Sequence, residues 1–343
     1  MSGSPNLRSA HRTLAVFLLA LSWLLSGTAA AADLETIKSE YQRPAEIPFP
    51  SHTPYSLHKA ALGKMLFYDP RLSGAQNMNC ASCHNPSFGY ETPVATAIGA
   101  ANTPLGRHAP TVLNLAWTPR LFWDGRADTL EDQAAGPITA PVEMNGKFPE
   151  IVERLDNIEE YRTWFAKLFP GEGVSRNNIL SAIATYERTV ISGTAPFDRW
   201  IDGDENAVTS EAKQGFELFV GKARCASCHT GWNFTDNAFH DIGLDTDDIG
   251  RAGITSDSNN TRHAFKTPGL RNLSYRAPFM HNGSMPDLKA VIAHYNFGGN
   301  KRPSLSPEMR PLQLSRTEQE NLLAFLLSLT AEKTNTPIPV LPN

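Results

Sequence analysis

Apolar residues recur at intervals of three and four through most of this chain, and strand-like alternation is sparse. Residues at that spacing share one face of a helix, so the pattern predicts amphipathic helices. Two long stretches, 91–118 and 241–261, show no sustained period and are predicted as loops. We therefore expect a mainly α fold. The predicted helices span 57–68, 129–135, 151–169, 178–192, 210–219 and the segment opened by the capping box Ser315–Glu318.

The N-terminal segment has a different pattern. Arg8 and Arg12 precede an apolar run at 14–25, and an alanine-rich stretch follows as far as Ala32. This order is typical of a secretory signal peptide, and the run is too short for an ordinary membrane span. We expect a cleaved signal at residues 1–32 and no stable membrane span in the mature protein. An uncleaved N-terminal anchor is the alternative.

Composition and charge narrow the class of protein. The 343 residues suffice for two domains of ordinary size, and 41% hydrophobic with 19% charged residues is typical of a globular protein. The net charge of −4 gives no indication of a nucleic-acid partner.

The motif Cys-Ala-Ser-Cys-His occurs twice and uses all 4 cysteines of the chain. C-x-x-C-H is the attachment signature of haem c, in which two thiols bind one porphyrin edge and the histidine binds the iron. A structural zinc site also uses paired C-x-x-C, but the trailing histidines and the long separation disfavour it. We predict two covalently bound haem c groups and, because such haem is assembled outside the bacterial cytoplasm, a location in the periplasm. The predicted haem-binding residues are Cys80, Cys83 and His84 for the first group and Cys225, Cys228 and His229 for the second.

A similar helical segment precedes each motif. The stretch Leu62–Phe67 before the first is echoed within 210–219 before the second, which indicates a duplicated haem-binding unit. We expect two cytochrome c-like haem domains in tandem, at 33–200 and 201–343. The last residues could return to pack on the N-terminal domain.

The residue on the far side of each iron decides what the haem can do. A haem with both axial positions filled only passes electrons, whereas one with an open position can bind peroxide and cleave it. Spacing alone does not choose among the candidate far-side ligands. These are the other histidines, the tyrosines and the methionines Met78, Met144, Met280, Met285 and Met309.

From residue 62 to residue 330 the chain resembles the bacterial di-haem cytochrome c peroxidase and MauG family. The resemblance covers most of the mature chain and includes Lys-Thr-Pro-Gly-Leu-Arg-Asn at 266–272. The other matching stretches, besides the two haem motifs, are 62–64, 67–73, 109–114, 122–128, 136–137, 141–144 and 281–284.

The resemblance implies roles for individual residues. His84 would hold the peroxidatic haem of the N-terminal domain, and His229 the electron-transfer haem of the C-terminal domain. Glu143 matches a carboxylate that moves a proton during O–O cleavage, and Trp123 matches a tryptophan between the haems. Without the family, Glu143 would be interpreted as a surface residue and Trp123 as a core aromatic. Two more residues match the first haem pocket: Gln133 and Pro137.

Three positions differ from the peroxidase pattern. Peroxidases that need reductive activation close the first haem with a loop histidine, and the matching residue here is Ala100, so this haem should be open. The sixth ligand of the second haem is methionine in the peroxidases and tyrosine in MauG. Here it is Tyr295, a hard donor that should lower the reduction potential of the second haem.

The family also implies calcium between the haems. Its ligands would be the carbonyls of Arg276 and Pro278, with His108, a poor calcium ligand, in place of asparagine.

The resemblance therefore implies a periplasmic enzyme that consumes hydrogen peroxide. In the MauG-like interpretation, a high-valent state shared by both haems oxidises a residue of a protein substrate. One alternative is a cytochrome c peroxidase that takes electrons from a small cytochrome c or copper protein. Another is a non-enzymatic di-haem electron carrier, which the open site expected at Ala100 argues against.

Overall fold

The computed structural model describes residues 34–51, 53–257, 261–333 and 335–343, so the predicted signal peptide lies outside the described residues. The described part is mainly helical, as predicted, with one sheet of two short antiparallel strands, β1 (Phe239–His240) and β2 (Phe265–Lys266). The α-helices are α2 (Leu57–Phe67), α3 (Cys80–Cys83), α4 (Leu130–Thr139), α5 (Phe148–Asp156), α6 (Glu159–Leu168), α7 (Arg176–Thr189), α8 (Pro196–Ile201), α9 (Ser210–Val220), α10 (Leu288–Phe297) and α11 (Arg316–Ser328). The single-turn 3-10 helices are η1 (Pro70–Leu72), η2 (Pro86–Phe88), η3 (Ala100–Asn102), η4 (Leu115–Trp117), η5 (Cys225–Ser227), η6 (Arg251–Gly253) and η7 (Leu273–Tyr275).

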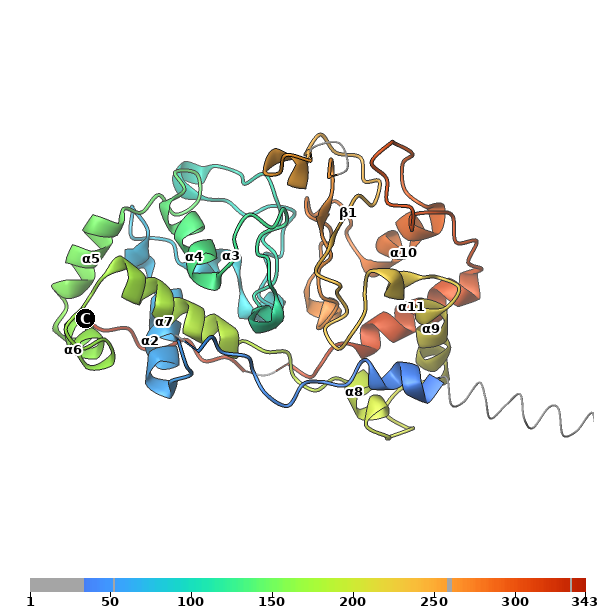
Figure 1. Ribbon diagram of the computed structural model, residues 1–343, viewed down its shortest axis with the longest axis horizontal. Helices are drawn as coiled ribbons and strands as arrows, with labels where there is room; N and C mark the ends of the chain where they lie inside the picture. Colours follow the sequence, from blue (N-terminus) through green and yellow to red (C-terminus); the bar gives the residue numbers. More distant parts are fainter. Residues whose placement is uncertain (1–33, 52, 258–260, 334) are drawn as a thin grey trace, which may run out of the picture.

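The helices form two groups at opposite ends of an elongated molecule, and loops together with β1 lie between them (Figure 1). In the N-terminal group α2 packs against α7, which also contacts α4 and α5. In the C-terminal group α9 packs against α11, which also contacts α10. Each group of helices has its own hydrophobic cluster. The loops between the two groups lie against both of them.

The repeated segment before each motif makes the same helix crossing in both halves. A Cβ atom on Gly63 of α2 would lie 1.8 Å from the carbonyl oxygen of Ala182 in α7. A Cβ atom on Gly215 of α9 would lie 2.0 Å from the carbonyl oxygen of Asn321 in α11. Any larger side chain would push the helices apart, so glycine is what allows the close approach.

Helix boundaries differ from the prediction in one important place. The single helix predicted at 151–169 is wrong, because the segment forms α5 and α6 with a break at Ile158. Ile158 is extended, with φ −97° and ψ 113°, and starts α6. Arg162 donates a 2.8 Å hydrogen bond to the carbonyl oxygen of Asp156, which gives the end of α5 a partner at the break.

The other predicted elements are close to those observed. The helix predicted at 129–135 continues to Thr139, with Pro137 inside it. The Thr139 hydroxyl donates to the carbonyl oxygen of Ala135 at 2.8 Å near the helix end. The stretches predicted as loops, 91–118 and 241–261, contain only single-turn 3-10 helices as helical structure in their described residues.

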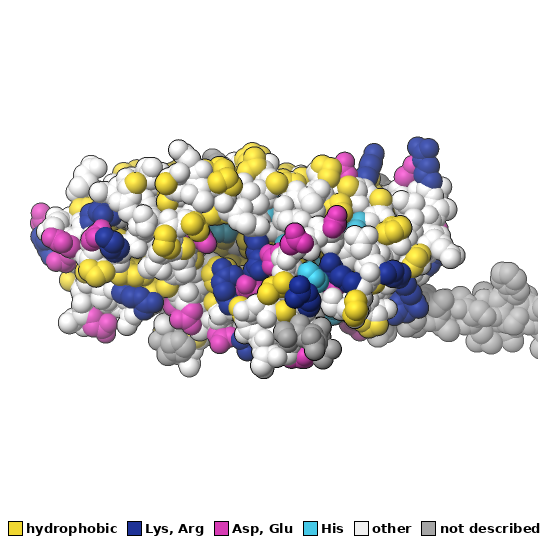
Figure 2. Space-filling model, turned by 90° about the horizontal axis from the view of Figure 1, so that it is seen from above, with side chains coloured by type: hydrophobic (Ala, Val, Ile, Leu, Met, Phe, Trp, Pro, Cys, Tyr) yellow, Lys and Arg dark blue, Asp and Glu magenta, His cyan; other side chains and the backbone are white. Residues whose placement is uncertain are grey.

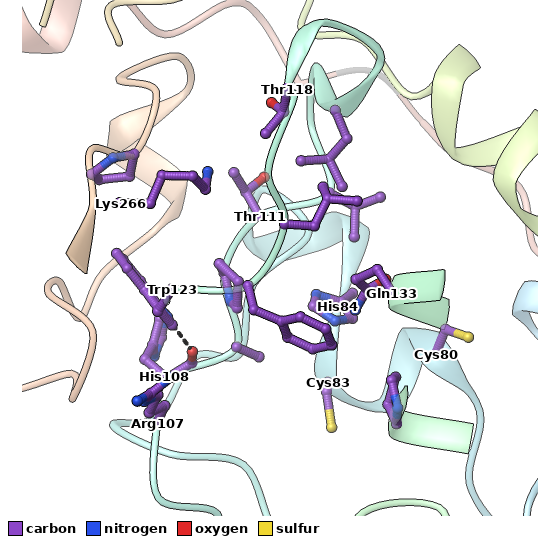
Figure 3. A pocket seen from close by; sticks show the side chains of 18 of the residues that line it. Cys80, Cys83, His84, Arg107, His108, Thr111, Thr118, Trp123, Gln133 and Lys266 are labelled. Atoms are coloured by element: carbon purple, nitrogen blue, oxygen red, sulfur yellow. Dashed lines mark hydrogen bonds between the residues drawn. The ribbon is translucent and has the colours of Figure 1, made fainter. Parts of the chain in front are cut away.

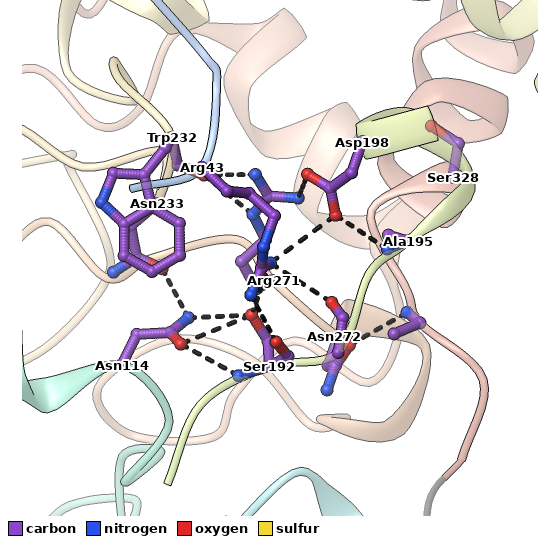
Figure 4. A network of polar contacts seen from close by, with 12 residues as sticks. Arg43, Asn114, Ser192, Ala195, Asp198, Trp232, Asn233, Arg271, Asn272 and Ser328 are labelled. Atoms are coloured by element: carbon purple, nitrogen blue, oxygen red, sulfur yellow. Dashed lines mark hydrogen bonds and ion pairs between the residues drawn. The ribbon is translucent and has the colours of Figure 1, made fainter. Parts of the chain in front are cut away.

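A buried polar network joins the two halves around Arg271 (Figure 4). Its Nη1 donates to Oδ1 of Asp198 at 2.6 Å, and its Nε donates to the carbonyl oxygen of Trp232 at 2.8 Å. From the other half, Nδ2 of Asn114 donates to Oδ1 of Asn233 at 2.8 Å. These bonds hold together loops that are far apart in the sequence, and they lie at the edge of the first cavity described below.

The chain ends on the side of the molecule where α5 and α6 lie, after the segment that follows α11 has crossed back along it (Figure 1). Within the described ranges, no helix combines the length and the apolar character that crossing a membrane requires.

Candidate functional site

Each Cys-Ala-Ser-Cys-His motif lies in the wall of its own cavity. The first cavity, of about 530 Å³, is lined by Cys80, Cys83 and His84. The second, of about 180 Å³, is lined by the corresponding residues of the other motif: Cys225, Cys228 and His229. The structure thus brings the thiols and the histidine of each motif to one cavity.

The identical motifs adopt different turns. The first forms α3, whose N-cap Asn79 accepts from the amide of Ser82 and donates to the carbonyl oxygen of Tyr68 at the end of α2. The second forms the 3-10 helix η5, which follows Arg224 in the left-handed region at φ 55°. The preceding residues therefore set the backbone of each motif.

The histidine of each motif makes the same kind of hydrogen bond, from Nδ1 to a backbone carbonyl oxygen five or six residues later in the chain. Nδ1 of His84 donates to the carbonyl oxygen of Tyr90 at 3.2 Å, and Nδ1 of His229 donates to that of Phe234 at 2.9 Å. These bonds place the proton on Nδ1 and leave the Nε2 lone pair available to a metal. Burial lowers the pKa of both imidazoles, which favours the neutral form that binds iron. Two thiols and a neutral imidazole in each cavity wall fit covalently bound haem c.

The lining of the first cavity includes three residues that the family resemblance assigned to the first haem pocket. Glu143, Gln133 and Pro137 all line it, together with Met144. Gln133 and Pro137 come from α4, and Glu143 from the turn that follows α4, where its amide donates to the carbonyl oxygen of Ala140 at 3.0 Å. Burial raises the pKa of the Glu143 carboxyl, and the positive charge of Arg126 opposes this shift.

Tyr295 of α10 is among the residues that line the second cavity. Burial raises the pKa of its phenol. Leucine and phenylalanine side chains of the C-terminal half form part of the remaining lining, together with polar side chains such as Arg224, His240 and Glu308. Of the candidate methionines, Met78 and Met144 line the first cavity, Met280 and Met309 line the second, and Met285 lines neither.

One wall separates the two cavities and belongs to both. Trp123 is part of it, and its Nε1 donates to the carbonyl oxygen of His108 at 2.8 Å (Figure 3). The Trp123 carbonyl oxygen accepts from the amide of Lys266 at 2.7 Å. The residues that line both cavities are His108, Trp123, Lys266, Pro268, Gly269 and Arg276.

The three residues expected at a calcium site lie near this wall. His108 and Arg276 line both cavities, and Pro278 lines the second. Nδ1 of His108 donates to the carbonyl oxygen of Ala95 at 3.0 Å, and its Nε2 lies 3.5 Å from Oε2 of Glu91. Nη2 of Arg276 donates to the other carboxylate oxygen of Glu91 at 2.9 Å. Glu91 is therefore a buried acidic residue at this place that sequence reasoning missed.

Sequence reasoning also missed a polar pair beside the second motif. Nε2 of His240 lies 2.8 Å from Oδ2 of Asp236, and the Cys228 sulfur completes a group of three potential ligands, the one such group among the described residues. A thioether at Cys228 could not act as a thiolate ligand, so this group belongs to the haem cavity, which His240 also lines. No sequence motif marks Asp236 or His240, because only folding brings them to Cys228.

Charged and histidine side chains gather near the middle of the face shown in Figure 2, between the two halves. Ion pairs of Arg107 also link the two halves. Arg107 binds Oδ2 of Asp124 at 2.7 Å and Oδ2 of Asp248 at 2.7 Å. The two carboxylates balance the positive charge of Arg107. Because Asp248 lies in the other half, the arginine also holds a loop of the N-terminal half to a loop of the C-terminal half.

The sequence matches two known families. Residues 57–206 match the family described as di-haem cytochrome c peroxidase, and residues 212–330 match cytochrome c. The methylamine utilization protein MauG of Methylorubrum extorquens is 48% identical over 317 residues, covering 92% of this chain and 90% of that protein. The cytochrome c551 peroxidase of Nitrosomonas europaea is 35% identical over 338 residues, covering 96% of this chain and 95% of that protein.

A solved structure has the same architecture. A MauG-like protein associated with microbial copper homeostasis superposes with a TM-score of 0.78 and 31% sequence identity, covering 85% of this chain and 95% of that one. With two cavities that each hold a thiol pair and a histidine, the chain belongs to the di-haem cytochrome c peroxidase and MauG family, and it is a di-haem peroxidase with covalently bound haem c.

Proposed function

We propose that this peroxidase is MauG-like: it reduces hydrogen peroxide in the first cavity and takes the two electrons from a residue of a protein substrate. Cys80, Cys83 and His84 would hold one haem, and Cys225, Cys228 and His229 the other. The haem irons supply the redox chemistry. Two protons accompany the two electrons, and the peroxide leaves as two water molecules.

Glu143 would move the proton in this reaction. Cleavage of the O–O bond requires a proton to pass from one peroxide oxygen to the other, and a carboxylate in the cavity wall can accept and return it. Burial supports this role because it raises the pKa of the carboxyl towards the working pH. Gln133 and Pro137, on the adjacent helix, would orient and confine the peroxide.

The observation that carries the MauG-like assignment is Tyr295 in the lining of the second cavity. We infer that its phenolate oxygen would bind the iron of the second haem. An anionic hard donor stabilises ferric iron, so this haem would be a poor acceptor of electrons from a small cytochrome. Trp123, in the wall between the cavities, would carry electrons from one haem to the other.

The second candidate function is that of a cytochrome c peroxidase, which draws electrons from a small cytochrome c or copper protein. It is favoured by the 35% identity to the cytochrome c551 peroxidase of Nitrosomonas europaea. A periplasmic location with a cleaved signal peptide belongs to both proposals, since haem c is attached outside the cytoplasm.

Calcium between the haems is a further part of the proposal. The carboxylate of Glu91 beside His108 supports it, because carboxylate oxygen is a ligand that calcium prefers. Metal analysis of the purified protein, before and after treatment with a chelator, tests it.

The deciding experiment uses the full chain matured with haem. Two haems per chain, with one high-spin and one low-spin ferric signal by electron paramagnetic resonance, are expected. Two low-spin signals would rule out an open first site. Rapid peroxide turnover with a reduced small cytochrome c would favour the second candidate function.

A further inference from the structure

Lys266 is a cation placed in the wall that the two cavities share. It is the last residue of β2, where its neighbour Phe265 pairs with His240 of β1. Its amide donates to the carbonyl oxygen of Trp123 at 2.7 Å. The backbone is thus fixed from two sides, and the side chain extends from the strand towards the first cavity (Figure 3).

The ammonium group of Lys266 has no hydrogen bond or ion pair to any residue that the structure describes. The neighbouring acidic groups already have cationic partners: Glu91 pairs with Arg276 at 2.9 Å, and Asp124 pairs with Arg107 at 2.7 Å. Burial, and secondarily the charge of Arg276, lowers the pKa of Lys266 to about 8. An ammonium group that faces a cavity without a protein partner is unfavourable, so an anion should accompany it in the mature protein.

The position of the thiols indicates which anion this is. In Figure 3, Cys80 and Cys83 lie on the opposite side of the first cavity from Lys266. Haem c is attached through its vinyl positions, and its two carboxylates project from the other edge of the porphyrin. A haem held by Cys80 and Cys83 therefore directs its carboxylates towards the shared wall. In the second cavity Lys266 again forms part of the lining with Cys225 and Cys228.

We propose that Lys266 is the common counter-ion of both haems and binds a carboxylate of each. This inference rests on the proposed attachment of haem at both motifs. One positive charge close to both porphyrins favours the reduced state of both irons, because reduction adds negative charge to each haem. Lys266 is therefore a positioning residue that couples the two reduction potentials and does not itself react with peroxide.

The test compares Lys266→Met and Lys266→Gln with Lys266→Arg, all in the full haem-loaded chain, by spectroelectrochemical titration of both haems. Each neutral variant should shift the ferric–ferrous equilibrium of both haems about tenfold towards ferric, a fall of about 59 mV for a one-electron couple. Lys266→Arg should restore the wild-type values. Lys147→Met, at an ion pair whose lysine side chain is 72% exposed, is the matched control and should change neither potential.

Unchanged potentials in both neutral variants, or a shift at only one haem, would overturn the proposal. If the neutral variants lose haem, retention in Lys266→Arg supports a charge pair, and loss in that variant as well overturns it. Failure of the proposed function looks different: the wild-type chain would then carry fewer than two haems or carry none at the two motifs.

Discussion

The backbone amide of Ala100 donates a 2.7 Å hydrogen bond to the carbonyl oxygen of Glu143. The loop at which the family resemblance implies a closing histidine thus lies directly against the turn that bears the proposed proton carrier. Gly99 and Glu143 both line the first cavity, and Ala100 directly follows Gly99 in the chain, so position 100 is next to the lining. A methyl group there offers no ligand atom.

Substitution of Ala100 by histidine should close the first haem. An imidazole at this edge would supply the missing axial ligand and convert the high-spin ferric signal to low spin. Electron paramagnetic resonance of the oxidised protein measures this directly. Ala100→Leu adds bulk without a nitrogen ligand and should keep the high-spin signal; a high-spin signal that persists in Ala100→His would contradict the placement.

Substitution of Glu143 by glutamine should slow the reaction with peroxide about 10²–10⁴-fold, because the proton acceptor is lost while the side-chain shape is kept. Both haem spectra should be unchanged. Stopped-flow mixing with peroxide gives the rate. Glu150→Gln, at an exposed ion pair in α5, is the matched control and should react like the wild type.

The pH dependence of the same reaction should follow Glu143. Burial raises its pKa above the ordinary 4.5, so the carboxylate form is lost at a higher pH than in an exposed glutamate. The wild-type rate should fall as the pH is lowered through that raised pKa, and this fall should be absent in Glu143→Gln. The same pH profile in both proteins would assign the proton transfer to another group.

Substitution of Tyr295 should change the second haem alone. Tyr295→Met should raise its reduction potential, since thioether sulfur stabilises ferric iron less than phenolate does. Tyr295→Phe removes the oxygen and should give a second high-spin signal. Tyr275→Phe is a control, because Tyr275 is not among the lining residues of either cavity and its hydroxyl donates to the carbonyl oxygen of Ala331. Wild-type spectra in both Tyr295 variants would exclude it as a ligand.

Substitution of Arg271 by methionine should destabilise the protein by about 3–5 kcal/mol, because the buried carboxylate of Asp198 loses its hydrogen-bonded guanidinium and keeps only Arg43, at 3.6 Å. Arg271 is 1% exposed, and its Nη1 lies 2.6 Å from Oδ1 of Asp198. Urea unfolding measures the loss. Arg316→Met removes an arginine whose side chain is 93% exposed and should cost less than about 0.5 kcal/mol. Equal small losses in both variants would mean that the Arg271 network does not hold the halves together.

The fold could be predicted where the information is local. Helical periodicity located α2, α7, α9 and α11, and the repeated segment indicated a duplicated unit; the close helix crossings at Gly63 and Gly215 were found only in the structure. The predicted helix at 151–169 was wrong because periodicity alone does not register the extended conformation at Ile158. The identical motifs could not reveal that they fold as an α turn and a 3-10 turn.

The sequence by itself determined the haem chemistry of this protein, because two thiols and a histidine within five residues are held together by the chain whatever the rest of the fold does. Only the tertiary structure decided what surrounds each iron. The shared wall takes Trp123 from one half and Lys266 from the other, and their backbone hydrogen bond forms only when the two halves pack. Packing also decides which charged side chains have no partner among the described residues. Lys266 is such a side chain, and the spacing of residues along the chain could not have predicted this.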